Sequence, residues 1–304
     1  MKLGFVSAIL DGWTFEEMME TAAGLGYECV EAACWPQGKA ERRYAGVSHI
    51  DVDNDSREYV NHIHETCKKT GVEISALAYY PNTMDGDFQK REAAIRHLKK
   101  VIAFSEKLGV GMVTTFVGRD QTKSVEENLE AFGRIWPPII QYAEEHGVRI
   151  AIENCPMLFG REQWPGGNNL FTSPALWRKM FDMIPSKNFG INYDPSHFVW
   201  QMMDYIQPIY EFRERIFHVH YKDIKVYPQK LKDVGIMAYP LEYMEPKLPG
   251  LGDVDWGRYV SALTDIGYDG FTCVEVEDRA FEADRERILD SLKLSKRYIE
   301  QFVI

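Results

Sequence analysis

The sequence predicts an α/β fold, a single (β/α)8 TIM barrel with long loops on its C-terminal face, and three observations support this prediction. First, an amphipathic stretch that stops at glycine and leads into a short β-rich run occurs five times, at Gly26, Gly71, Gly109, Gly147 and Gly267. Glycine readily adopts the left-handed conformation that ends a helix, so each occurrence indicates a helix followed by a strand. Second, Gly71, Gly109 and Gly147 are spaced 38 residues apart. Third, eight units of this length account for all 304 residues.

Each barrel element can be placed along the chain. Strands are expected near residues 2–6, 27–33, 73–79, 110–116, 148–153, 188–194, 215–221 and 271–276. Apolar residues three and four positions apart predict helices at 16–25, 91–108, 125–146 and 279–301. Within the third helix, Pro137-Pro138 predicts a kink or a restart. Strands that alternate with helices pair in parallel, and no linker divides the sequence, so residues 1–304 are predicted to form one domain.

Three predicted loops are too long for plain turns. They span residues 35–55, 154–172 and 222–254, and each follows a strand. In a TIM barrel the loops after the strands lie on the C-terminal face, where active sites are found. We therefore expect these loops to surround the active site.

The charge of the chain argues against nucleic acid as a partner. Its 46 acidic residues outnumber its 35 lysines and arginines, which gives a net charge of −11, whereas phosphate binding needs a basic surface. No apolar run approaches the roughly 20 residues of a membrane helix. The five cysteines are scattered without a Cys-x-x-Cys pair, which suits a reducing compartment. These observations predict a cytoplasmic protein that binds neither nucleic acid nor membranes.

Side chains able to bind a metal lie at the ends of the last four predicted strands. They are Glu153, Asp194, His220 and Glu275. The C-terminal ends of these strands meet on one face of a barrel, so we expect the four side chains to converge. Three carboxylates and one imidazole suit octahedral Mn²⁺, our first choice, or Mg²⁺ or Co²⁺, and they suit tetrahedral zinc less well. A single acid at a strand end more often makes a salt bridge or caps a helix, but four such groups on consecutive strands favour a metal site.

Neighbouring residues offer alternative ligands. Because residues two apart on a strand point to the same side, His218 shares the side of His220, and Glu277 shares that of Glu275. We favour His220 and Glu275 as the ligands, with His218 deeper in the barrel and Glu277 higher.

Three stretches of the chain carry a recognisable pattern. They are Asp194-Pro-Ser-His197, His218-Val-His220-Tyr-Lys-Asp223 and Gly267-Tyr-Asp-Gly-Phe-Thr-Cys-Val-Glu275. These stretches resemble the signature motifs of the xylose-isomerase-like TIM-barrel superfamily, also called the sugar phosphate isomerase/epimerase family. The resemblance implies one divalent ion held by the four residues named above. It also implies that Glu153 and Glu275 serve as catalytic acid and base and that His197 contacts the substrate.

One stretch departs from the pattern of this superfamily. Its ketose 3-epimerases usually carry an arginine a few residues after the histidine of the seventh strand, whereas this chain has Lys222-Asp223-Ile224-Lys225. The departure weighs against a free-ketohexose epimerase. Lys222 and Asp223 are predicted to bind substrate.

Tryptophans divide into two groups by their place in the predicted fold. Those that follow strands offer aromatic faces to a sugar or an aglycone, and Trp13 and Trp35 are predicted to bind substrate. The others of this group are Trp164 and Trp200. Those in helical stretches are expected to pack in the core, and they are Trp136, Trp177 and Trp256.

The chemistry expected of such a site is removal of a proton next to a sugar carbonyl. A divalent ion stabilises the negative charge that develops, and a glutamate takes the proton. The sequence therefore predicts a divalent-metal-dependent sugar isomerase or epimerase acting on a small sugar or sugar derivative. It leaves open whether the chain works alone, as a homo-oligomer or with a small second subunit.

Other functions are compatible with the same residues. One is elimination on a keto-sugar or 3-keto-glycoside, of the inosose dehydratase or C-glycoside deglycosidase type. Another is an endonuclease acting at abasic sites, which the net charge of −11 and the lack of further His and Asp ligands oppose. The last is a binding module without catalysis, which would hold no stoichiometric metal.

Overall fold

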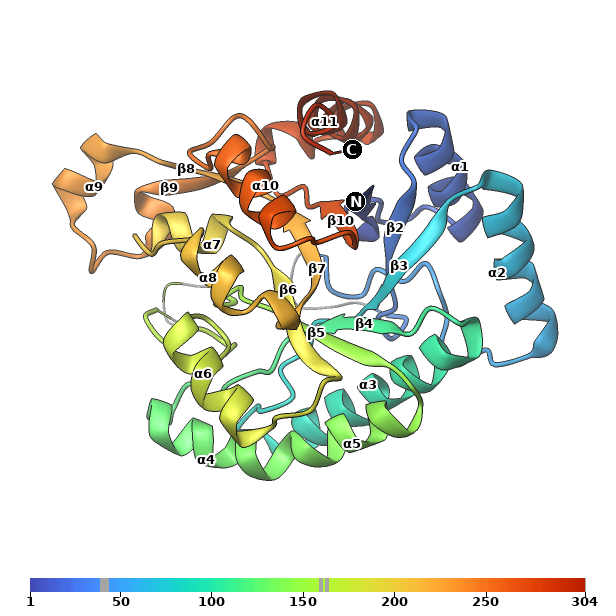
Figure 1. Ribbon diagram of the computed structural model, residues 1–304, viewed down its shortest axis with the longest axis horizontal. Coiled ribbons are helices and arrows are strands. Elements are labelled where there is room, and N and C mark those ends of the chain that lie inside the picture. Colours follow the sequence, from blue (N-terminus) through green and yellow to red (C-terminus); the bar gives the residue numbers. More distant parts are fainter. Residues whose placement is uncertain (39–43, 159–160, 162–163, 304) are drawn as a thin grey trace.

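Parallel strands close into a barrel (Figure 1). The computed structural model describes residues 1–38, 44–158, 161 and 164–303, so parts of the predicted loops 35–55 and 154–172 lie outside the described residues. The barrel strands are β1 (Lys2–Val6), β2 (Cys29–Ala33), β3 (Glu73–Ala78), β4 (Met112–Thr115), β5 (Arg149–Glu153), β6 (Phe189–Tyr193), β7 (Ile216–Tyr221) and β10 (Phe271–Val274). Around the barrel they follow the order β1-β10-β7-β6-β5-β4-β3-β2. This arrangement confirms the predicted TIM barrel.

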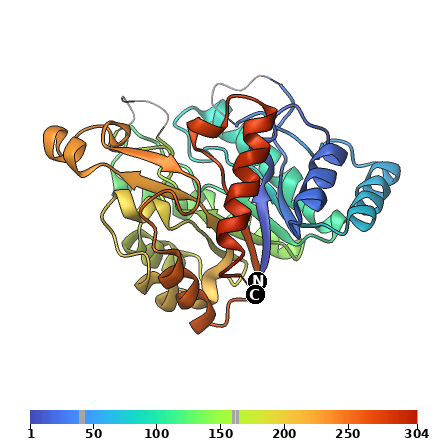
Figure 2. The same cartoon turned by 90° about the horizontal axis from the view of Figure 1, so that it is seen from above.

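Helices surround the barrel on its outside (Figure 2). The longer ones are α1 (Phe15–Leu25), α2 (Arg57–Thr70), α3 (Phe88–Leu108), α4 (Val125–Ile135), α5 (Pro137–Glu145), α6 (Pro174–Met183), α10 (Trp256–Asp265) and α11 (Arg285–Ile299). The first three end at Gly26, Gly71 and Gly109, each with a positive φ between 70° and 75°. The glycine stops are thus confirmed at these helices. In the part of the chain described, no helix is long and apolar enough to cross a membrane.

The predicted restart at Pro137-Pro138 is confirmed. The stretch 125–146 contains two helices, because Pro137 lacks the N–H that would continue α4 and instead starts α5. Another helix differs from the prediction. The predicted helix 279–301 begins only at Arg285, where the Asp284 side chain caps it by accepting a hydrogen bond from the Arg287 amide. Helix α2 is the helix that the stop at Gly71 predicts, although the sequence did not give its bounds.

The tryptophans of the helical stretches pack in the core, as predicted. Trp136, Trp177 and Trp256 are at most 1% exposed. Each indole nitrogen still donates a hydrogen bond: Trp136 to the carbonyl of Val117 and Trp177 to that of Phe171. The buried indoles therefore keep a hydrogen-bond partner for the N–H group while they fill the space between barrel and helices.

The segment after β7 forms a small lobe rather than a plain loop. Its strands β8 (Asp223–Val226) and β9 (Met244–Lys247) pair in antiparallel fashion, with the short helix α9 (Pro228–Val234) between them. We name residues 223–254 the lobe. In Figure 2 it projects on the side away from the two chain termini.

Asp223 anchors the lobe to the barrel. This carboxylate is fully buried and accepts hydrogen bonds from the amides of Ile224, Gly250 and Val254 and from the indole of Trp256. Its oxygens thus join the first and last residues of the lobe. The position does not support the predicted contact between Asp223 and substrate.

We predict that Asp223→Asn loosens the lobe. The amide of Gly250 and the indole of Trp256 both donate to Oδ2 of Asp223. If the amide nitrogen of an asparagine takes the place of this oxygen, it cannot accept from these two N–H groups, and the loss costs about 1–3 kcal/mol. Hydrogen exchange of residues 223–254 should quicken, and the unfolding free energy in urea should fall. Asp253→Asn is the matched control, because Asp253 is exposed and accepts one hydrogen bond, from Val226. Equal changes in hydrogen exchange and unfolding free energy for the two substitutions would contradict the anchoring role of Asp223.

Candidate metal and active site

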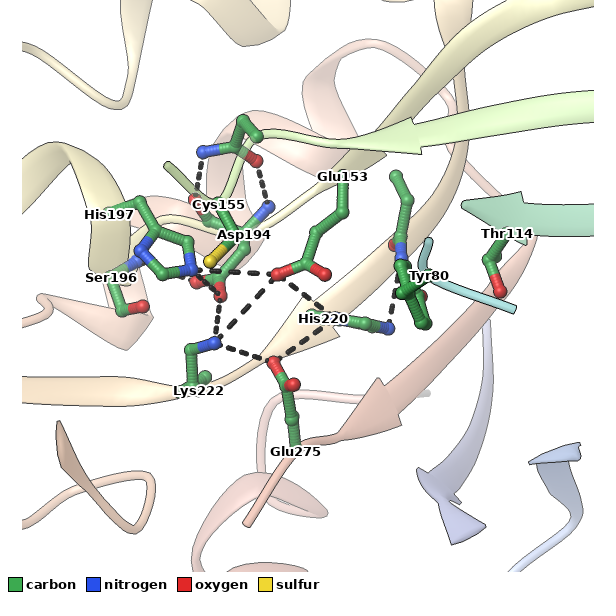
Figure 3. A network of polar contacts seen from close by, with 12 residues as sticks. Tyr80, Thr114, Glu153, Cys155, Asp194, Ser196, His197, His220, Lys222 and Glu275 are labelled. Atoms are coloured by element: carbon green, nitrogen blue, oxygen red, sulfur yellow. Dashed lines mark hydrogen bonds and ion pairs between the residues drawn. The ribbon is translucent and has the colours of Figure 1, made fainter. Parts of the chain in front are cut away.

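The four predicted ligands converge at the C-terminal end of the barrel (Figure 3). Glu153 ends β5, Asp194 follows β6, His220 lies in β7, and Glu275 follows β10. One ligand atom from each lies within 4.8 Å of the ligand atoms of all the others. The parallel strands bring these side chains together because all their C-terminal ends meet on one face.

The side chain of Asn154 fixes Asp194 in place. Its amide nitrogen donates to the Asp194 carbonyl, and its oxygen accepts from the Asp194 amide, both at 2.8 Å. The Ser196 amide, at the start of the short helix α7 (Ser196–Trp200), donates to Asp194 Oδ1 at 2.8 Å. Oδ2 is left to face the cluster.

A second asparagine holds the end of β5. Asn169 donates to the carbonyls of Glu153 and Cys155, at 2.9 and 2.8 Å. Its oxygen accepts from the amides of Val117 and Gly118 after β4 (3.2 and 3.3 Å). The backbone on either side of the Glu153 side chain is therefore tied to two neighbouring segments.

Glu31 of β2 orients His220, and sequence reasoning missed it. Its Oε2 lies 2.6 Å from His220 Nε2, so Nδ1 of the imidazole faces Glu275 Oε2 at 3.3 Å. Oε1 of Glu31 accepts hydrogen bonds from Tyr80 and Thr114. A carboxylate behind a metal-binding histidine is the usual means of fixing the ring and its tautomer. The signal in the sequence was a charged residue inside the otherwise apolar strand 29–33.

The polar atoms left over in this cluster fit a divalent cation. Glu153 Oε1, Asp194 Oδ2 and His220 Nδ1 are buried and make no hydrogen bond within the described part of the chain. Buried polar atoms normally find hydrogen-bond partners, whereas these three have only charged neighbours such as Lys222, so the group offers its free electron pairs to a cation. Oxygen and imidazole donors suit Mn²⁺, Mg²⁺, Co²⁺ or Zn²⁺.

Lys222 inserts a positive charge among these same groups. Its ammonium lies 2.7 Å from Glu275 Oε2, 3.0 Å from Asp194 Oδ2 and 3.8 Å from Glu153 Oε1, and the side chain is only 2% exposed. Glu277 is also near, at 3.4 Å. The lysine thus neutralises part of the carboxylate charge from within the cluster.

Burial and charge move the pKa values of the two glutamates in opposite directions. Burial, and next the neighbouring Glu275 carboxylate, raise the pKa of Glu153. Burial also opposes ionisation of Glu275, but the Lys222 ammonium and His220 together outweigh it and lower the pKa of Glu275. For Glu31, the nearby His220 overcomes the effect of burial and lowers the pKa to about 2.

A small cavity opens onto the cluster. We name this cavity of about 110 Å³ the inner cavity, and Glu153, Lys222 and Glu275 line it, together with Trp35. The predicted contact between Trp35 and substrate is compatible with this place. Trp13 lies elsewhere, half-buried under the guanidinium of Arg285 (4.8 Å), and is not among the residues lining the inner cavity.

The remaining predicted residues flank the cluster. His197 Nε2 lies 3.2 Å from Asp194 Oδ2 and 3.5 Å from Glu153 Oε1. Both ring nitrogens of His218 already have partners, because Nδ1 meets Asn192 at 3.0 Å and Nε2 meets Ser75 at 3.1 Å. His218 is not one of the four residues of the cluster, although its ring, Glu31 and His220 form a second group of possible metal ligands.

Comparison with known families agrees with this geometry. Residues 19–298 match the family described as xylose isomerase-like TIM barrel. The chain belongs to this family. Its sequence is 25% identical to the uncharacterised protein YfiH of Bacillus subtilis (strain 168), over 99% of this chain and 100% of that one. It is 24% identical to an inosose dehydratase of Lactiplantibacillus plantarum, over 72% of each chain.

A solved structure of the same fold contains a metal. The IolI protein, whose crystal structure has a zinc atom, superposes with a TM-score of 0.73 at 18% identity, over 99% of each chain. This likeness shows the shared xylose isomerase-like barrel. The choice of Mn²⁺ for this chain stays a prediction.

We predict that Lys222→Met strengthens divalent metal binding and destabilises the metal-free protein. A metal would no longer displace an ammonium, so affinity in calorimetry should rise by about tenfold or more. Without metal, unpaired buried carboxylates should cost about 3 kcal/mol in unfolding free energy. Lys230→Met removes the same charge from an exposed pair with Glu245 and should change neither quantity. Weaker metal binding by the Lys222 variant would contradict the claim that the ammonium competes with the metal for the carboxylates.

We predict that Glu31→Gln weakens metal binding by about ten- to a hundredfold, because the His220 ring loses the carboxylate that fixes it. The measurement is titration with Mn²⁺ and Zn²⁺ of folded protein, checked by circular dichroism. Ser75→Ala removes hydrogen bonds to His218, to the Val30 carbonyl and to Cys273 but none to His220, so it serves as the control and should leave the affinity unchanged. An unchanged affinity in the Glu31 variant would refute the positioning role.

Proposed function

We propose that this protein is a divalent-metal-dependent sugar isomerase or epimerase that removes a proton next to a carbonyl. The observation that carries the proposal is the position of two glutamates. Of the four candidate ligands, Glu153 and Glu275 line the inner cavity, whereas Asp194 and His220 do not appear in its lining. A substrate in the described cavity therefore meets two carboxylates beside the proposed ion.

The proposed reaction needs two contributions, stabilisation of negative charge and transfer of a proton. A bound divalent ion would supply Lewis acidity, which stabilises negative charge on a carbonyl oxygen. One of the glutamates accepts the proton from the adjacent carbon, and the other returns a proton from its own side. Return to the opposite face inverts the carbon, and return to the neighbouring carbon isomerises the sugar.

Elimination is the second candidate, and His197 favours it. This imidazole lines the larger cavity next to the inner one and lies 3.5 Å from Glu153 Oε1. A histidine there is within reach of a leaving oxygen while Glu153 holds the neighbouring proton. The relationship to an inosose dehydratase supports the same candidate.

We predict that protein loaded with Mn²⁺ and given a keto-sugar in D₂O places deuterium at the carbon next to the carbonyl. Glu153→Gln or Glu275→Gln should slow this exchange by about a hundredfold or more, because a general base is lost while an oxygen of similar size remains. Mass spectrometry and proton NMR measure the label. Asp253→Asn, which changes an exposed acid of the lobe, should leave the exchange unchanged.

Metal content must be measured on the same samples, because each glutamate is also a proposed ligand. Unchanged deuterium exchange in both variants at full metal occupancy would refute the role of Glu153 and Glu275 as bases. A hydride shift would keep the original hydrogen, and phosphodiester hydrolysis would give no label on carbon, so either outcome excludes the proposed reaction. Parallel loading with Zn²⁺ decides which metal supports turnover.

A further inference from the structure

Cys155 lies beside the carboxylate cluster and has no part in the proposed function. It follows Glu153, the last residue of β5, by two positions, and its half-buried side chain lines both the inner cavity and the larger cavity next to it. Its sulfur accepts a hydrogen bond from the Met157 amide at 3.3 Å. A metal ion can therefore reach this thiol through either cavity.

Three potential metal ligands meet at the thiol (Figure 3). Ligand atoms of Glu153, Cys155 and His197 all lie within 4.8 Å of one another. His197 Nε2 and Glu153 Oε1 are 3.5 Å apart, close to the spacing of about 3.4 Å expected of two ligand atoms at about 2.0–2.1 Å from one tetrahedral ion. These two atoms thus already have the spacing of ligands to a single ion, and the sulfur lies nearby.

The imidazole of His197 supplies a second, independent observation. Its ring is 7% exposed, and Nε2 makes no hydrogen bond to any residue that the structure describes. Nδ1 lies 3.5 Å from the indole nitrogen of Trp200, beyond the usual hydrogen-bond distance of about 2.7–3.2 Å. This long contact fixes the tautomer only weakly, so Nδ1 can carry the proton while Nε2 offers its electron pair to an ion.

The group formed by Glu31, His218 and His220 differs in this respect. Both ring nitrogens of His218 have partners, Asn192 and Ser75, and His220 Nε2 lies 2.6 Å from Glu31. An ion between these three residues would have to break hydrogen bonds of the barrel interior. An ion at Cys155 breaks no hydrogen bond of His197 Nε2 within the described part of the chain.

The charge around Lys222 leaves room for a second cation. Among the described residues, four carboxylates lie within 3.8 Å of its ammonium, those of Glu153, Asp194, Glu275 and Glu277. The ammonium and one divalent ion together offset three of these negative charges. The fourth remains, and a thiolate at position 155 adds one more, so a second divalent ion would balance the site.

We propose that Glu153, Cys155 and His197 form a second metal site, which takes the thiophilic cation Zn²⁺. Thiolate and imidazole ligands favour zinc over Mn²⁺ or Mg²⁺, and three protein ligands leave the fourth tetrahedral position open. Binding releases the thiol proton to the solvent. The Glu153 carboxylate would be shared with the ion of the four-residue cluster, so the second ion competes with the proposed roles of Glu153 and His197 in proton transfer.

Cadmium, a spectroscopic substitute for zinc, tests this site in the full-length protein without turnover. Thiolate ligation of Cd²⁺ gives a charge-transfer absorption in the ultraviolet, which carboxylate and imidazole ligands do not give. We expect metal-free protein to bind two Cd²⁺ ions per chain with this absorption. Cys155→Ser should lose the absorption and bind one ion. His197→Gln, which keeps the thiol, should also bind one ion, and zinc content after dialysis should follow the same pattern.

Cys67→Ser is the matched control, because Cys67 is also half-buried yet lines neither cavity at the cluster. This variant should keep both ions and the absorption, and circular dichroism checks the folding of each variant. Three outcomes would overturn the proposal: a single ion in the unaltered protein, a second ion without the absorption, or an absorption that survives in Cys155→Ser. Because the carboxylate cluster is tested separately with Mn²⁺, a missing thiolate absorption alongside normal Mn²⁺ binding overturns the second site alone.

Discussion

Compensation of buried negative charge governs this site. Glu153, Asp194 and Glu275 bring ligand oxygens within 4.8 Å of one another in a place that water scarcely reaches. Like charges at such distances repel, and each carboxylate also loses hydration, so the arrangement requires positive charge. Lys222 supplies it from the chain itself, and a divalent ion would supply it more strongly. The same requirement explains why Lys222, directly after β7, is almost completely buried.

Neutral side chains do most of the positioning around this charge. Asn154 bridges the ends of β5 and β6, and Asn169 ties β5 to the segment after β4. Amides offer donors and acceptors together, so they fix the backbone without adding to the negative charge. Glu31 is the exception, and it meets His220 on the side away from the other carboxylates, where its charge orients the ring.

The lobe adds a wall beside the site at the strand ends. Its residues Ile224, Tyr243 and Met244 pack with Trp200 of α7 in a hydrophobic cluster next to the cavities. In the proposed function the carboxylates at the strand ends would carry the chemistry, while the loops that follow the strands would shape the space for the ligand.

The sequence by itself determined the barrel, because glycine stops such as Gly71 and the strand–helix alternation follow from local backbone chemistry. It also indicated that Glu153 and its three partners gather at one end. Only the tertiary structure decided what each polar side chain meets. Glu31 bonds His220 across 189 positions of sequence. Asp223 and Lys222 are adjacent in the chain, yet one anchors the lobe and the other enters the carboxylate cluster. A local pattern fixes the face on which a residue lies, whereas its partner depends on segments brought near by folding.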